Sequence, residues 1–325
     1  MGEASQSVTA NDDLKARIVD FMRAASTEIT PGDVGRLPDL TQVGPAGTSI
    51  YVAHTPHAAF EQVIHAALAV RRAGFLATPH IAARRISNAM TLRAGLDELR
   101  AGGIEHILLV AGDAPQPLGE FTSTLDILES GILERSGITR IGIAGHPEGH
   151  GAASSELLWR ALGSKQAFAA RTGIGMHIVT QFGLNAGAAA VWQREFKSHD
   201  IHLPVHVGIA GPASLSKLIH FAIQCGIGAS MHASLHVLLR NLSVRNLSTR
   251  NLSAAANLPG LAVSPDQHLL ALMASPFMAQ FVAPHFFAFG GTVETARWMR
   301  QIAAGAFDID SKAGKFKLRN LRDHD

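Results

Sequence analysis

Polar residues capable of acid–base or ligand chemistry recur directly after short apolar segments of this chain. Carboxyl and imidazole groups can exchange protons, and amides can both donate and accept hydrogen bonds. Each residue also has an ordinary structural interpretation: Glu28 as a solvated carboxylate, Asp113 as a turn residue, and His80 as a buried histidine with its own partners. The candidates are Glu28, His54, His80, Asp113, His146, Glu148, His150, Gln181 and His285.

The segment HPEGH raises a metal site as one alternative. His146 and His150 have the separation of the two histidines in the helical HExxH zinc motif. Pro147 disfavours the helix that would place both imidazoles on one face. We therefore expect no bound metal, and a metal-dependent hydrolase built on His54, His80, His146 and His150 is the least favoured hypothesis.

The elements that must position these residues alternate along the chain. Short apolar runs predict strands near 25–29, 48–54, 75–80, 105–111, 138–144, 175–181, 203–209 and 283–289. Amphipathic periodicity predicts helices near 57–73, 88–101, 123–135, 153–171, 186–197, 213–225 and 292–305. Such alternation favours parallel strands with right-handed crossovers, and eight units in about 300 residues favour a closed barrel. The predicted fold class is therefore α/β, a (βα)₈ TIM barrel.

An open doubly wound sheet is the competing fold. That fold usually carries a glycine-rich GxGxxG turn after its first strand. The turn after Ile29 reads TPGDVG, which does not match. In a closed barrel, side chains at the carboxyl ends of the strands surround one mouth, so the candidate residues are expected to lie together there.

Three segments fall outside the alternation. An N-terminal helix, capped by Asn11 or Asp12, is expected to place Leu14, Ile18, Met22 and Ala25 on one face. An insertion before the last strand contains RNLSVRNLSTRNLS at 240–253, interpreted as a loop or short helix over the barrel mouth. Residues 1–310 are predicted to form one barrel domain, and the locally basic residues 311–325 a solvated tail.

Composition excludes several classes of protein. The net charge of +2 gives no reason to expect a nucleic-acid partner. One cysteine, Cys225, permits no disulfide within the chain and no cysteine-based zinc site. No apolar run approaches the ~20 residues of a membrane span, and the N-terminus has no signal-peptide pattern. We expect a cytoplasmic protein without a membrane partner, and the sequence leaves homo-oligomer formation open.

Taken in order, the strand ends resemble those of the methylenetetrahydrofolate reductase family. The matching segments are STEITP at 26–31, ATPHIA at 77–82, LLVAGDAP at 108–115, IGIAGHPEGH at 141–150, IVTQF at 178–182, VGIAGP at 207–212 and PHFFAFGG at 284–291. The family segments read like FEFFPP, PHLTC, LRGD, AGYPE-H, ITQ-F, PGI-P and HFYT-NR. The order and spacing extend over most of the chain, and a short form with only the catalytic barrel is implied.

The resemblance implies an FAD-dependent oxidoreductase that interconverts 5,10-methylenetetrahydrofolate and 5-methyltetrahydrofolate. NAD(P)H or another electron donor or acceptor would exchange electrons with the flavin, and tetrahydrofolate derivatives would then occupy the same site. Glu28 matches the catalytic acid that protonates N10 of the folate. A carboxyl donates at neutral pH only when partial burial raises its pKa, which a strand end at a closed mouth can provide.

The same resemblance assigns the remaining site residues. Asp113 matches a catalytic aspartate near the flavin that also accepts from the pterin. Gln181 and Phe182 match folate-contacting positions. The FAD would lie against His54, His80, Val110, Ala111, Gly112, Asp113, His146 and Lys165.

The chain departs from the family pattern at four strand ends, the first being STEITP at 26–31, which lacks the aromatic residues of FEFFPP. Ala111 and Gly291 stand where the family has arginine, and His146 stands where it has tyrosine. A second hypothesis follows from the lost arginines: a folate-binding or electron-transfer accessory subunit without independent reductase activity.

Overall fold

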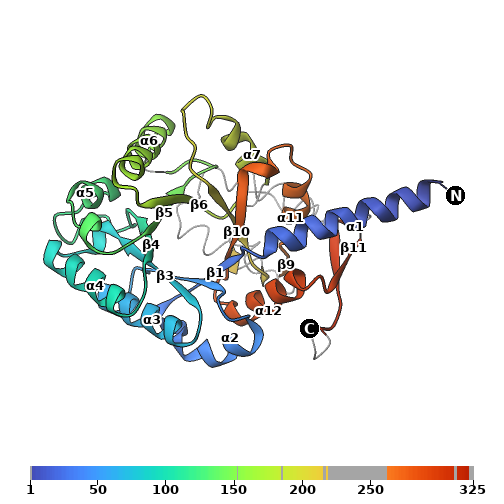
Figure 1. Ribbon diagram of the computed structural model, residues 1–325, viewed down its shortest axis with the longest axis horizontal. Coiled ribbons are helices and arrows are strands. Elements are labelled where there is room, and N and C mark those ends of the chain that lie inside the picture. Colours follow the sequence, from blue (N-terminus) through green and yellow to red (C-terminus); the bar gives the residue numbers. More distant parts are fainter. Residues whose placement is uncertain are drawn as a thin grey trace, which may run out of the picture.

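The computed structural model describes residues 2–151, 153–183, 186–214, 217–218, 262–310 and 313–321. Within them, eight parallel strands close into a barrel in the order β1-β10-β7-β6-β5-β4-β3-β2 (Figure 1). The strands are β1 (Ser26–Ile29), β2 (Ser49–Val52), β3 (Leu76–Ala82), β4 (His106–Val110), β5 (Arg140–Gly145), β6 (Gly175–Thr180), β7 (Val205–Ala210) and β10 (Phe281–Phe287).

Helices surround this ring of strands (Figure 1). Those that follow strands are α3 (Phe60–Arg72), α4 (Ala89–Ala101), α5 (Thr124–Glu129), α6 (Ser155–Thr172), α7 (Ala186–Arg194) and α12 (Thr292–Ala303). Short 3₁₀ turns add η2 (Ala83–Arg85), η3 (Leu133–Arg135) and η5 (Met278–Gln280). The predicted (βα)₈ barrel is therefore confirmed.

Strand alternation decides which side chains enter the barrel. On β1 and β2, Ile29 and Val52 pack into the main core between strands and helices. Their neighbours Glu28 and Tyr51 must point the other way, because successive residues of a strand face opposite sides. In β4 and β6, the inner residues Leu108 and Val179 form a separate small cluster with Tyr51.

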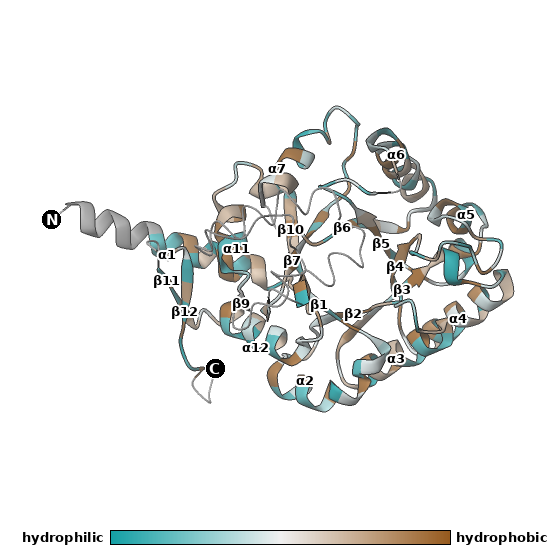
Figure 2. Ribbon diagram, turned by 180° about the vertical axis from the view of Figure 1, so that it is seen from behind, coloured by the Kyte–Doolittle hydropathy of each residue, from teal (hydrophilic) through white to brown (hydrophobic). Residues whose placement is uncertain are grey.

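Helix ends follow ordinary capping chemistry. The Asn88 side chain accepts the Thr91 N–H at the start of α4, and the Ser154 hydroxyl accepts the Leu157 N–H at the start of α6. Gly173 ends α6 at φ 74°, a left-handed conformation that favours glycine. In Figure 2, α3, α4 and α12 carry both hydrophilic and hydrophobic residues, as expected for helices with one face on the core.

Several elements lie outside the predicted alternation. A 3₁₀ turn η1 (Pro31–Arg36) and helix α2 (Leu37–Val43) connect β1 to β2. The strands β8 (Ala213–Ser214) and β9 (Ala262–Val263) form an antiparallel ribbon, followed by helix α11 (Asp266–Met273). The expected helix at 213–225 is thus wrong at its first two residues, which pair as a strand. Most of its remainder and the repeat at 240–253 lie outside the described residues.

Both chain ends differ from expectation. Helix α1 spans Gly2–Met22 and begins well before the predicted caps at Asn11 and Asp12. It extends away from the barrel towards the N-terminus (Figure 1). The basic residues Lys315, Lys317 and Arg319 of the expected solvated tail are exposed, but the segment is ordered, because β12 (Lys315–Leu318) pairs with β11 (Phe307–Asp310). Phe316 anchors this hairpin, since its ring centroid lies 4.6 Å from that of Phe307.

No helix among the described residues has the length and apolar character needed to cross a membrane.

Candidate active site

The strand ends bring the predicted acid and a buried histidine together at the barrel mouth. Glu28 on β1 keeps 19 % of its side chain exposed, and its Oε2 lies 3.9 Å from Nε2 of His285 on the adjacent β10. His285 is 1 % exposed, and its Nδ1 lies 2.9 Å from the Ser26 hydroxyl. A carboxyl with one side towards solvent and an imidazole behind it can take up or release a proton.

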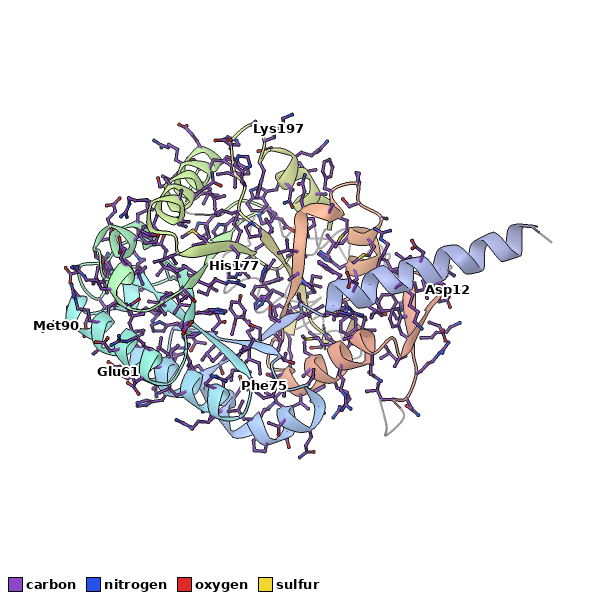
Figure 3. The ribbon with its side chains drawn as sticks, in the orientation of Figure 1. Asp12, Glu61, Phe75, Met90, His177 and Lys197 are labelled. Carbon is purple, nitrogen blue, oxygen red and sulfur yellow. The ribbon has the colours of Figure 1, made fainter. Side chains whose placement is uncertain are left out.

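Below this pair, polar rings fill the interior of the barrel. The Tyr51 hydroxyl lies 3.0 Å from Nε2 of His177, and the ring centroids of Tyr51 and His285 are 4.6 Å apart. The His177 ring is 4.3 Å from that of His206. Figure 3 shows His177 within the ring of strands. Tyr51, His177 and His206 are not among the candidates from the sequence, although a histidine within an apolar strand is a signal that could have indicated the last two.

Burial keeps the inner imidazoles neutral. It lowers the pKa of His177 to about 2, with further lowering by His206 and Arg140. Burial likewise lowers the pKa of His80 to about 3, with contributions from His285 and His54. Each neutral ring has one N–H and one acceptor nitrogen, so each requires two different kinds of partner.

Asp113 lies in the turn after β4, where the resemblance places it, but with an unexpected partner. Its Oδ1 is 2.7 Å from Nη2 of Arg85, and 55 % of its side chain is exposed. Gly112 precedes it at φ 89°, and a Cβ there would come 3.1 Å from the Ala82 side chain. Ala111, at the end of β4, provides no guanidinium. Arg85, from the turn after β3, supplies one close to that strand end.

Arg84 holds the rest of this loop in place. Its guanidinium donates to the carbonyl oxygens of Ala114, Pro115 and Thr122 at 2.7, 2.8 and 3.2 Å. The adjacent Arg85 side chain is thus left to reach Asp113 and the Pro56 carbonyl at 2.8 Å.

Lys165 on α6 lies close enough to His146, which follows β5, to influence its charge. Burial lowers the pKa of Lys165, on the amphipathic helix α6, to about 8. The side chain is 8 % exposed and makes no hydrogen bond within the described part of the chain. Burial, His150 and Lys165 together lower the pKa of His146 to about 4. An ammonium without a partner in the protein can bind an anionic group.

Gln181 and Phe182 follow β6 and line a small cavity of about 20 Å³, room for one water molecule. Glu148 and His268 also line it, and His268 belongs to α11, which the sequence analysis did not predict. Phe182 is 2 % exposed and packs against Phe289 with ring centroids 4.9 Å apart. Its aromatic face is thus used within the protein, and Gln181 is the more accessible of the two.

The remaining predicted residues lie around the same mouth. His54 follows β2, and its Nδ1 accepts the Ala82 N–H at 3.4 Å. Burial and Arg85 lower its pKa to about 4. The Nε2 atoms of His54 and His80 are buried and have no hydrogen-bond partner among the described residues. Val110 packs against the inner cluster around Tyr51, and Ala111 is exposed.

The metal alternative receives no support from this arrangement. The described residues contain no group of three or more His, Cys, Asp or Glu side chains placed to hold a metal ion. The HPEGH segment forms a turn closed by a Gly149 N–H to His146 carbonyl bond of 3.0 Å, as the proline within it favours.

No family model matches the chain. Among solved structures, a mutant tryptophan synthase α-subunit from Pyrococcus furiosus is 12 % identical, with 87 % of this chain and 96 % of that chain covered and a TM-score of 0.46. A putative lyase/mutase from Burkholderia cenocepacia is 15 % identical, with 81 % and 98 % covered and a TM-score of 0.36. Similarity at this level carries no information about the reaction of this chain.

Proposed function

We propose that the protein is an FAD-dependent oxidoreductase that interconverts 5,10-methylenetetrahydrofolate and 5-methyltetrahydrofolate. The observation that carries the proposal is the position of Glu28. This carboxyl lies at the barrel mouth, partly exposed, with His285 behind it at 3.9 Å. The resemblance of the strand ends to methylenetetrahydrofolate reductases requires an acid at this strand end.

The residues at the mouth fit FAD on two observations. The Lys165 side chain is 8 % exposed and its ammonium has no hydrogen-bond partner in the described part of the chain, which suits a phosphate oxygen. The buried Nε2 atoms of His54 and His80 are also without partners there, which suits the polar edge of a ring system. When bound, FAD would supply the hydride donor and acceptor of the reaction.

The chain's own residues would then bind and orient the folate and exchange a proton with it. Glu28 gives a proton to N10 when the one-carbon bridge opens and recovers it in the reverse direction. His285 can orient the Glu28 carboxyl, because its Nε2 lies 3.9 Å from that carboxyl and its Nδ1 lies 2.9 Å from the Ser26 hydroxyl. Asp113 and Gln181 offer a carboxylate and an amide, groups that suit the N–H donors and acceptors of a pterin edge.

The arginine lost at Ala111 also supports a second candidate, a folate-binding accessory subunit that takes up no flavin. Its strongest basis is that Asp113 already pairs with Arg85, which reduces the negative charge available to a ligand. In that case the folate would bind without electron transfer.

Anaerobic titration of the purified protein distinguishes the two. The protein is mixed with FAD, separated from free flavin, photoreduced, and then mixed with 5,10-methylenetetrahydrofolate. We expect stoichiometric FAD and reoxidation of the flavin by the folate, and unchanged reoxidation in the control variant Glu129→Gln, an exposed carboxyl on α5. Folate binding without FAD uptake would support the accessory subunit, and binding of neither would contradict both.

A further inference from the structure

A second cavity opens at the amino-terminal end of the barrel, opposite the mouth. Its volume of about 640 Å³ lies in the range of small-molecule sites, roughly 300–1,000 Å³. Among its lining residues are those that begin strands, including Ser49 on β2, Leu76 on β3, His106 on β4 and Arg140 on β5. In barrels of this kind, the amino-terminal end normally contributes stability and carries no site.

One wall of this cavity is polar and basic. It consists of Tyr51, His106, Arg140, His177 and His206. His106 and Arg140 are paired neighbours on β4 and β5, and His177 and His206 have ring centroids 4.3 Å apart. His106, Arg140, His177 and His206 come from the four adjacent strands β4 to β7, and Tyr51 comes from β2. Figure 3 shows His177 within the ring of strands.

His177, which lines this cavity, has a buried ring nitrogen without a partner among the described residues. His177 is 5 % exposed, and its Nε2 lies 3.0 Å from the Tyr51 hydroxyl. When Tyr51 donates to Nε2, the neutral imidazole carries its proton on Nδ1. Nδ1 is buried and has no hydrogen-bond partner among the described residues, and the same is true of Nδ1 of His206. Buried donors are normally paired, so an acceptor is missing at this point.

The charge around these nitrogens is positive. The guanidinium of Arg140 makes no ion pair or hydrogen bond within the described part of the chain, and the described lining residues include no carboxylate. Burial is the largest cause of the lowered pKa of His106, and the charge of Arg140 is the second. The nearby Glu105 raises this pKa, but by less than Arg140 lowers it. An anion in the cavity would reverse this lowering and pair with both groups.

The opposite wall is apolar. It contains Met22, Phe75, Leu76, Val282 and Met299. Leu76 and Val282 are each 48 % exposed, which is unusual for large apolar residues within strands and is explained by their position on the open cavity.

We propose that this cavity binds an organic oxyanion, whose carboxylate or phosphate meets Arg140 and His177 and whose apolar portion contacts the Phe75 and Met299 wall. The site is separate from the mouth and does not depend on the reaction proposed there. Carboxylate and phosphate share the recognition chemistry, because both offer several acceptor oxygens to a guanidinium and an imidazole.

Calorimetric titration of the full-length protein with two probes tests this site. Inorganic phosphate tests the oxyanion alone, and hexanoate tests a carboxylate with an apolar chain. Binding of phosphate supports a phosphate ligand, and preferential binding of hexanoate supports an apolar carboxylate. At probe concentrations up to about 10 mM, even binding with a dissociation constant of about 1 mM gives a measurable heat. Absence of heat from both probes would therefore overturn the proposal.

Variants locate the bound probe. Arg140→Gln should weaken binding by about tenfold or more, as expected for loss of a charged hydrogen-bond partner. Arg93→Gln makes the same charge change on an exposed part of α4 and should leave the affinity within about twofold. His177→Asn gives a second measure at the unpaired nitrogen, with circular dichroism to confirm that each variant is folded. Equal affinity in wild type, Arg140→Gln and His177→Asn would place the probe elsewhere and overturn the proposal.

Discussion

Nε2 of His285 lies 3.9 Å from Oε2 of Glu28, across the junction at which β10 and β1 close the barrel. The distance exceeds that of a hydrogen bond, but it is short enough for a small movement of the carboxyl to close it. Because Ser26 fixes the other nitrogen, His285 cannot turn freely to find another partner. The pair therefore places Glu28 in the mouth with an imidazole behind it.

His285→Phe should slow the folate half-reaction by roughly tenfold and flatten its pH profile, since general acid–base effects on a reaction amount to ~10²–10⁴-fold and His285 acts only through Glu28. The phenyl ring keeps the contacts with Tyr51 and Phe287. KM for the folate should stay nearly constant. The matched control is His65→Phe, which removes an exposed histidine 3.6 Å from Glu98. An unchanged pH profile would make His285 a packing residue only.

The Asp113–Arg85 ion pair predicts opposite effects of its two members on the flavin potential. Asp113→Asn removes a negative charge and should raise the midpoint potential, because the anionic reduced flavin is then less disfavoured. Arg85→Gln should lower it. An exposed charge is worth up to about 1 kcal/mol, so each shift should be on the order of 20 mV for two electrons.

Spectroelectrochemistry of the FAD-loaded variants measures these shifts. The control is Asp97→Asn, which breaks an exposed pair with Arg100 at 3.4 Å on α4. Asp113→Asn should also weaken folate binding. If the potential and the folate affinity both stay at wild-type values, Asp113 is only a turn residue.

Lys165 predicts a specific dependence of stability on pH. Burial lowers its pKa in the folded protein from 10.5 to about 8. Between these values the unfolded chain binds the proton more strongly, so the free energy of unfolding rises as the pH rises through this window. The penalty at neutral pH is on the order of 3 kcal/mol.

Lys165→Met should therefore stabilise the protein at pH 7 and remove that rise, as measured by urea denaturation between pH 7 and 10.5. It should also weaken FAD binding. Lys197→Met, at an exposed lysine on the periphery (Figure 3), should change neither quantity. A rise of the same size in Lys165→Met and wild type would contradict the assignment.

The barrel could be predicted from the sequence because it rests on local patterns. Apolar strand runs and amphipathic helices alternate, and the structure closes the eight strands in the expected ring. The β11–β12 hairpin could not be predicted, since Phe316 is one apolar residue among basic ones and its burial depends on Phe307 and Trp298. The basic composition of this segment predicted that it is solvated, whereas its pairing with β11 depends on tertiary packing.

The positions of the candidate residues could be predicted only where the order of the strands brings these residues together. Glu28, His80, Asp113 and Gln181 were expected at one mouth because parallel strands share a carboxyl end. The pairing of Asp113 with Arg85 depends on the loop that Arg84 holds, which no periodicity encodes. The Tyr51–His177 contact crosses the barrel between strands that are not neighbours, so only the closed structure reveals it.

The central claim is that Glu28 donates the proton that folate reduction requires. Glu28→Gln keeps the shape of the side chain but cannot donate a comparably acidic proton, whereas electron transfer from NAD(P)H to the flavin requires no such acid. Stopped-flow absorbance of the FAD-loaded protein follows each half-reaction separately, with Glu129→Gln as the control. We predict that Glu28→Gln reduces the rate of flavin reoxidation by 5,10-methylenetetrahydrofolate by ~10²–10⁴-fold and leaves flavin reduction within about twofold of wild type. Equal loss in both half-reactions, or a folate half-reaction at the wild-type rate, would contradict the account.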